Sequence, residues 1–213
     1  MILNIPQKKI EELLNNQISI FFGLSKDEEL ILAKAFDKSL RRTEFCFSKN
    51  KNKYYKRKGK TFFNTYHSGQ YCIFLYFISN TIYKTGPKKK IYKTLADKVY
   101  YLNKTLNGLD LFYEVEMPKV FILDHPVGSV IGRGKFKDYF SFSSGCVVGN
   151  NKGKYPKIGK NVRMLSTSKI LGDCKIGDNV TFSANSYIKD KNIPDSVIVF
   201  GQHPNNIIKK KKN

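Results

Sequence analysis

The sequence predicts an α+β chain in which a helical N-terminal half precedes a triangular solenoid of short parallel β-strands. Two observations support this fold class. Apolar residues recur at helical spacing in the first half, and large apolar residues recur every six positions in the second. A helix repeats about every 3.6 residues and a strand about every two. A six-residue period fits neither alone and is typical of a solenoid with three short strands per turn.

Four helices are expected in the first 108 residues. They cover 6–21, 27–40, 64–84 and 95–106. The first has one apolar stripe. Ser25 and Glu28 form a capping box before the second. The third is apolar almost all round, which is typical of a helix buried on most sides. The basic segment 49–60 between the second and third helices is expected to be a loop.

The six-residue period begins after residue 108, where we place the domain boundary. The leading apolar residues are Ile158, Met164, Ile170, Ile176, Phe182 and Ile188, preceded less regularly by Phe136, Phe142 and Val148. Glycine and alanine share this period, as turns at each corner require. Ten residues separate Val148 from Ile158, so the segment NNKGKYPK holds four residues beyond a regular unit. We expect it to leave a corner of the coil as a loop.

The formal net charge of +21 is large for 213 residues. Basic residues cluster at 49–60, at Lys88–Lys90 and in an expected tail at Lys209–Lys212. Nucleic acid, an anionic membrane surface or an acidic substrate could account for them. Solvated lysines in a Lys- and Asn-rich sequence are the alternative. Because no nucleic-acid-binding module is recognisable, we expect no nucleic-acid partner, and peripheral membrane contact is left open.

Several features place the chain in the cytoplasm. No apolar run is long enough to span a bilayer, and the N-terminus lacks a signal-peptide pattern. The four cysteines are scattered without the CxxC spacing of metal or redox sites. We therefore expect reduced thiols in a cytoplasmic protein.

His125 is the candidate general base among three histidines. Asp110 precedes it by fifteen residues, close to one coil of about eighteen, so the two side chains could lie on adjacent coils near one corner. A carboxylate bound to one imidazole nitrogen leaves the other free to activate a hydroxyl nucleophile. A structural histidine is the alternative. We expect His67 to pack between helices or line an acceptor pocket, and His203 to lie at the surface.

Segments of the second half resemble the serine O-acetyltransferase family of hexapeptide-repeat acyltransferases. They are LDLFYEVEMPKVFILDHPVGSVIGRG, YPKIG, and ILGDCKIGDNV with SANSYI. The resemblance implies a helical domain over 1–108, a left-handed parallel β-helix over 109–213, and acetyl transfer from acetyl-CoA to a hydroxyl without a metal. The family's Asp-x13-Asp-His element matches Asp110, Asp124 and His125. His125 would be the base, Asp110 its partner, and Asp124 would face the acceptor.

The resemblance also implies where acetyl-CoA binds. Asn150, Ser166 and Ala184 fall where the family's backbone lines the pantetheine arm. Lys169 and Lys189 could meet the CoA phosphates, although each could equally be an ordinary solvated lysine. Because such grooves form between neighbouring subunits in this class, the resemblance implies a homotrimer or a dimer of trimers.

The acceptor-binding residues depart from the family pattern. The family holds the serine carboxylate with an Arg-His pair before Pro-Lys-Ile, and Lys154 and Tyr155 stand there instead. Lysine keeps the charge but lacks the bidentate fork of arginine. We therefore expect a sugar acceptor, in surface-polysaccharide biosynthesis. L-Serine, giving O-acetylserine for cysteine biosynthesis, is the alternative.

Three further hypotheses stay open at this point. The same base could serve N-acetylation of an amino sugar. A non-enzymatic basic scaffold or nucleic-acid binder would instead bind oligonucleotides in a salt-sensitive way and would not bind CoA. Arg133, which follows the His125 element, could contact an acidic acceptor.

Overall fold

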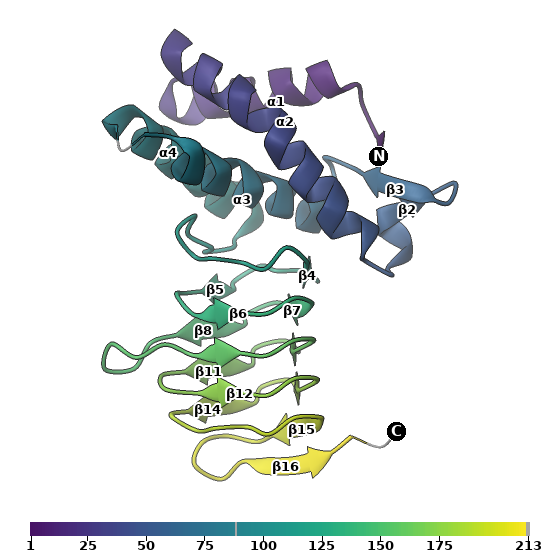
Figure 1. The fold of residues 1–213 in the computed structure, drawn as a ribbon, viewed down its shortest axis with the longest axis vertical. Coiled ribbons are helices and arrows are strands. Elements are labelled where there is room, and N and C mark those ends of the chain that lie inside the picture. Colours follow the sequence, from purple (N-terminus) through teal and green to yellow (C-terminus); the bar gives the residue numbers. More distant parts are fainter. Residues whose placement is uncertain (88, 212–213) are drawn as a thin grey trace. The chain divides into compact units, whose positions relative to one another are not determined.

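The computed structural model describes residues 1–87 and 89–211 (Figure 1). The chain divides into two compact units, Met1–Asn107 and Gly108–Asn213. The predicted fold class, a helical N-terminal domain followed by a left-handed parallel β-helix, is confirmed. Two lysines of the predicted basic clusters, Lys88 and Lys212, lie outside the described residues. No helix in the described part of the chain has the length and hydropathy to cross a membrane.

Four helices build most of the first unit. They are α1 (Gln7–Phe22), α2 (Lys26–Ser48), α3 (Ser68–Thr85) and α4 (Lys90–Asn107). Every residue from Gly69 to Ile82 is buried, so α3 is the buried helix that its apolar composition predicts. It begins four residues later than predicted, because His67 caps it by accepting the Gln70 backbone N–H at Nδ1 over 3.4 Å.

The predicted loop over 49–60 is wrong in part. This segment contains the short 3₁₀ helix η1 (Lys53–Tyr55) and β2 (Lys56–Arg57). It ends at the start of β3 (Lys60–Phe63), which forms a hairpin with β2 and is parallel to β1 (Ile2–Leu3). Tyr55 and Phe63 are buried with their rings 4.8 and 5.8 Å from that of Phe47. These aromatic contacts hold the segment in place. Its lysines are exposed and interrupt the apolar pattern, so the sequence did not indicate strands here.

Three sheets form the sides of the solenoid in the second unit, and the coils stack along its axis (Figure 1). The first side contains β4 (Phe121–Leu123), β7 (Phe140–Phe142), β10 (Arg163–Met164), β13 (Thr181–Phe182) and β15 (Val197–Phe200). The second contains β5 (Val130–Ile131), β8 (Val147–Gly149), β11 (Lys169–Leu171) and β14 (Tyr187–Lys189). The third contains β6 (Lys135–Phe136), β9 (Lys157–Ile158) and β12 (Lys175–Ile176).

The strand register places the apolar residues of the six-residue period in inward columns. Paired sets are Phe142, Met164 and Phe182; Val148, Ile170 and Ile188; and Phe136, Ile158 and Ile176. All are buried except Phe136, which is half-buried. Met164 pairs with Phe182, 18 positions on, whereas Phe142 pairs with Met164, 22 positions on. The difference confirms the four-residue insertion between these coils.

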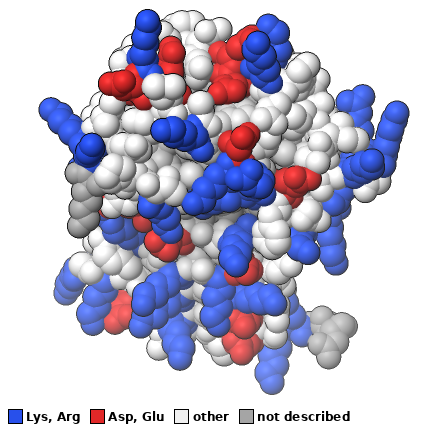
Figure 2. All heavy atoms as spheres, turned by 45° about the horizontal axis from the view of Figure 1, so that its top comes forward, with Lys and Arg blue, Asp and Glu red and all other residues white. Residues whose placement is uncertain are grey.

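The C-terminal lysines are only partly the tail that the sequence predicts. Lys209 and Lys210 belong to β16 (Ile207–Lys210), which pairs antiparallel with β15 and is exposed along its whole length. Lysines on such an open edge oppose pairing with another strand. Figure 2 shows Lys and Arg side chains spread over the visible face with Asp and Glu among them, rather than gathered in one patch.

The inward columns generate a test of the core. Ile170 is fully buried in β11, whereas its neighbour Lys169 is exposed. Replacing Ile170 by Ala should lower the free energy of unfolding by about 2–5 kcal/mol, because the surrounding coils cannot close the cavity. Lys169→Ala should change it by less than about 0.5 kcal/mol. Urea denaturation followed by circular dichroism measures both, and equal losses would contradict the assigned core.

The capping box of α2 generates a pH test. Burial opposes ionisation of Glu28, but hydrogen bonds from Lys98 Nζ (2.7 and 2.8 Å) and the Ser25 backbone N–H (2.9 Å) outweigh it. The pKa of Glu28 is therefore below its ordinary value of 4.5. The ionised form stabilises the fold above pH 4.5, and this contribution is lost as the pH falls through the lowered pKa.

Glu28→Gln should accordingly lower the melting temperature at neutral pH, and the difference from the wild type should shrink under acid. Glu12→Gln is the matched control, because Glu12 pairs with Lys9 on the exposed surface and should matter little. A Glu28→Gln difference that is independent of pH would show that the carboxylate charge is not what stabilises this helix start.

Candidate functional site

The corner after β4 is larger than the same corner in the next coil. Leu123 pairs with Phe142 and Val130 with Val147, so residues 124–129 occupy the place of residues 143–146. The two additional residues push the turn outward. His125 lies in this turn with a φ of 51°, and its side chain is 91% exposed. The enlarged corner thus presents an imidazole on the outside of an otherwise regular coil.

Two carboxylates accompany this corner. Asp124 Oδ1 lies 3.8 Å from His125 Nε2. The Asp110 backbone bridges to Val130, and its N–H donates to the Ser129 carbonyl over 2.9 Å. The backbone therefore holds Asp110 beside the end of the His125 turn, on the adjacent segment that the sequence spacing suggests. The direct pairing of Asp110 with His125 stays a prediction.

Small side chains follow His125 along the same corner of the later coils. The register of β7, β10 and β13 makes Ser144, Ser166 and Ala184 equivalent, and Ser144 Oγ donates to Ser166 Oγ over 3.2 Å. The residues after them, Gly145, Thr167 and Asn185, all have φ between 59° and 65°. The same turn therefore repeats at this corner in three successive coils.

The four inserted residues form a tight hairpin at the next corner. Asn151 and Lys154 exchange backbone hydrogen bonds of 3.1 and 3.0 Å. Between them, Lys152 and Gly153 have φ values of 49° and 76°. Positive φ at both central residues is the type I′ geometry of two-residue hairpins. The predicted loop is therefore a structured hairpin. The Lys-Gly pair at its centre is the feature of the sequence that could have indicated a tight turn.

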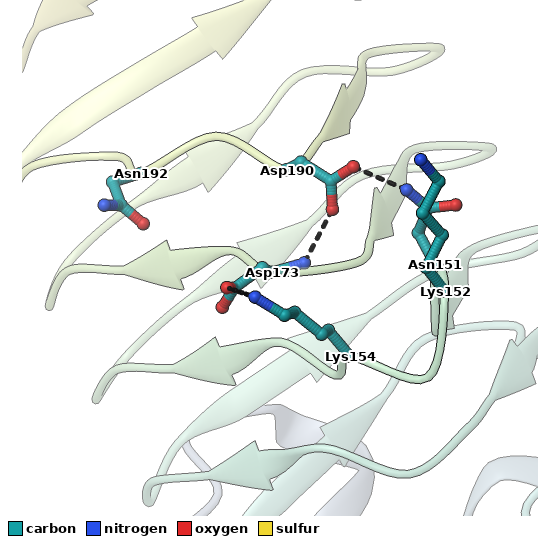
Figure 3. A pocket seen from close by; sticks show the side chains of 6 residues that line it. All are labelled: Asn151, Lys152, Lys154, Asp173, Asp190 and Asn192. Carbon is teal, nitrogen blue, oxygen red and sulfur yellow. Dashed lines mark hydrogen bonds and ion pairs between the residues drawn. The ribbon is translucent and has the colours of Figure 1, made fainter.

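Two aspartates from later coils anchor the hairpin (Figure 3). Asn151 Nδ2 donates to Asp190 Oδ2 over 2.5 Å, and Lys154 Nζ lies 3.1 Å from Asp173 Oδ2. The Asp173 backbone N–H donates to Asp190 Oδ1 over 2.8 Å. This bond and the Asn151 amide lower the pKa of Asp190. With Lys152 and Asn192, these residues line a pocket of about 460 Å³.

Tyr155 ends the hairpin beside an arginine of the preceding coil. Lys135 pairs with Lys157, so Arg133 and Tyr155 occupy equivalent positions two residues earlier. Arg133 Nη2 donates to Glu114 Oε2 over 2.8 Å, and Tyr155 is 38% exposed. The corner therefore carries Glu114, Arg133 and Tyr155 in sequence along the stack of coils.

Comparisons with known proteins identify the family. Residues 155–190 match the model of the bacterial transferase hexapeptide family (six repeats). A serine acetyltransferase of Staphylococcus epidermidis is 30% identical over 150 residues, which cover 68% of this chain and 67% of the relative. The chain belongs to the serine acetyltransferase family. It is an acyltransferase by that membership.

Solved structures of serine acetyltransferases share this fold along nearly the whole chain. The Neisseria gonorrhoeae enzyme is 21% identical with a TM-score of 0.72, and the match covers 96% of this chain and 81% of that one. The Brucella abortus enzyme in complex with coenzyme A is 19% identical with a TM-score of 0.70, and the match covers 99% and 84%.

The residues that sequence reasoning selected for a serine acetyltransferase site fall at two corners of the solenoid. The first corner holds Asp110, Asp124, His125, Ser166 and Ala184, and the second holds Asn150, Lys154, Tyr155 and Lys189. Asn150 is thus separated from Ser166 and Ala184 within one chain. Sequence reasoning missed Asp173 and Asp190, because their contact with the hairpin depends on coil register.

In residues 1–87 and 89–211, no His, Cys, Asp and Glu side chains form a group suited to a metal ion.

The anchored hairpin generates a test. Asp190→Ala removes the acceptor for both Asn151 Nδ2 and the Asp173 N–H, so the hairpin should open more often. We expect faster hydrogen exchange at the Asn151 and Lys154 amides, with unchanged exchange at the buried strand β11. Asp195→Ala is the control, since Asp195 accepts a similar backbone bond, from Asp178, at another corner. Unchanged exchange in Asp190→Ala would show that the type I′ turn alone orders the hairpin.

Proposed function

We propose that this protein is a serine O-acetyltransferase that moves acetyl from acetyl-CoA to the hydroxyl of L-serine. The observation that carries the proposal is the enlarged corner, which presents His125 at the head of a column of small side chains. An exposed imidazole is accessible to an acceptor, and small side chains beside it suit the donor. Membership of the serine acetyltransferase family supports the same chemistry.

In the proposed mechanism His125 is the general base. One imidazole nitrogen accepts the proton of the acceptor hydroxyl as its oxygen attacks the thioester carbonyl. Asp110 holds the other nitrogen and stabilises the imidazolium that forms. Asp124, 3.8 Å from His125, faces the acceptor. Backbone N–H groups of the corner stabilise the oxyanion, and His125 returns the proton to the departing thiolate.

Acetyl-CoA supplies an activated acyl group. Ser166 and Ala184 suit its pantetheine arm, because small side chains let an extended chain approach the backbone of the corner. Asn150 and Lys189 lie at the second corner of the same chain, so they would join the donor site from a neighbouring subunit. The proposal therefore includes a homotrimer, single or paired. A Brucella abortus relative whose structure contains coenzyme A supports the donor.

The comparisons favour L-serine, the alternative acceptor, over the sugar expected from the altered loop. The curated relatives that match this chain are serine acetyltransferases. A polysaccharide role and N-acetylation have no comparable support. Family membership likewise argues against the non-enzymatic scaffold hypothesis. We place the reaction in the cytoplasm, where acetyl-CoA is available and the four buried thiols can stay reduced.

His125→Asn tests the base. Asparagine keeps a polar side chain but cannot accept the proton at neutral pH, so kcat should fall by about 10²–10⁴. The dissociation constant of CoA should be unchanged, because His125 is not expected to hold the donor. Thiol release from acetyl-CoA with L-serine measures turnover, and calorimetry measures CoA binding. His203→Asn, a change at the exposed surface, is the matched control.

A panel of acceptors tests the substrate. Wild-type protein should release CoA with L-serine and not with free or nucleotide-linked sugars. Turnover with a sugar but not with L-serine would overturn the proposed acceptor while keeping the acetyltransferase chemistry. Retention of wild-type turnover by His125→Asn would overturn the assignment of the base.

A further inference from the structure

The hairpin lysine is engaged within its own chain. Lys154 Nζ lies 3.1 Å from Asp173 Oδ2, and the hairpin that carries it is also held by Asp190 through Asn151. Figure 3 shows the Lys154 side chain extended toward Asp173. A cation paired in this way neutralises a carboxylate of a neighbouring coil. It is therefore a weak candidate for binding the carboxylate of an acceptor.

Arg133 is also paired with a carboxylate, but its guanidinium has five N–H donors where the ammonium of Lys154 has three. Its side chain is 58% exposed, and its Nη2 donates to Glu114, whose side chain is 28% exposed. A guanidinium has five N–H donors in a fixed plane, so one bond to Glu114 orients the group and leaves other donors available. Glu114 comes from the preceding segment and holds the arginine at the corner without covering it.

Tyr155 completes this arrangement. The β6–β9 register aligns it with Arg133, and the Lys135 N–H donates to the Pro156 carbonyl over 3.0 Å, so the two backbones are in contact here. The pKa of Arg133 is raised, first by the hydrogen bond to Glu114 and to a smaller degree by Tyr155, which places the phenol beside the guanidinium. A phenol O–H and a planar fork side by side suit a carboxylate.

We propose that Arg133, oriented by Glu114 and flanked by Tyr155, binds the acceptor carboxylate and is a specificity-determining residue of this enzyme. Because Arg133 lies at the second corner and His125 at the first, the two would meet one acceptor from neighbouring subunits. The inference rests on the proposed serine acetyltransferase activity. It assigns to an arginine of the preceding coil the contact that the sequence alone suggested for Lys154. The site takes an α-amino acid with a free carboxylate, and a neutral amide at that position should bind poorly.

Steady-state kinetics of Arg133→Met and Lys154→Met test this assignment as a matched pair. Each change removes one cation and keeps an unbranched apolar side chain. Arg133→Met should raise KM for L-serine by about 10–100-fold, the usual effect of losing hydrogen bonds to a charged group. Its KM for acetyl-CoA should stay within about threefold of the wild type. Lys154→Met should change the KM for L-serine by less than about threefold.

L-Serinamide separates carboxylate recognition from a general loss of binding. It keeps the hydroxyl and amine of serine but replaces the carboxylate with a neutral amide. The wild type should prefer L-serine over L-serinamide by about 10–100-fold in kcat/KM, and Arg133→Met should lose that preference. Arg133→Lys keeps the charge without the planar fork, so its preference for L-serine should be intermediate. This variant replaces Arg133→Met in the test if Arg133→Met does not fold.

The outcomes distinguish this inference from the proposed function. Absence of L-serine turnover in the wild type would overturn the proposed function and the inference with it. Efficient wild-type turnover with an unchanged KM in Arg133→Met would overturn the inference alone. A raised KM in Lys154→Met, with Arg133→Met unaffected, would return the carboxylate contact to the hairpin lysine.

Discussion

Hydrogen bonding between successive coils is the constraint on which the second unit depends. Its strands are two to four residues long and would not be stable alone, so the inner strands are held by pairing with the coils on either side. Pairing at constant register stacks equivalent residues in columns. One column can then be apolar and face the core, as Phe142, Met164 and Phe182 do, while a neighbouring position is small at every level.

The same constraint decides where functional groups can be added. An extra residue within a strand would shift every later pair, so additional residues leave the coil at corners. Two insertions of this solenoid occur there: the enlarged turn that carries His125 and the hairpin between β8 and β9. The regular coils hold these two features rigidly, and His125 and Tyr155, candidates for base and acceptor contact, lie on them.

The effect of charge in this protein depends on which charged side chains pair, rather than on the net charge. Acidic residues are few, and individual ones select particular cations: Asp173 engages Lys154, and Glu114 orients Arg133. Both cations are held by a carboxylate, but the guanidinium of Arg133 keeps more N–H donors than the ammonium of Lys154. The excess of lysine therefore says less about binding than the positions of a few aspartates and glutamates.

The sequence by itself determined the helical half, the solenoid, the length of the insertion and the candidate base, because these depend on local periodicity and on residue type. It missed the hairpin over 56–63, since the burial of Tyr55 and Phe63 depends on their packing against Phe47 of α2. Only the tertiary structure paired Lys154 with Asp173 and Asn151 with Asp190. The six-residue period records the coil register, but these contacts join side chains 19 and 39 positions apart and also depend on how the hairpin folds, which no local pattern records.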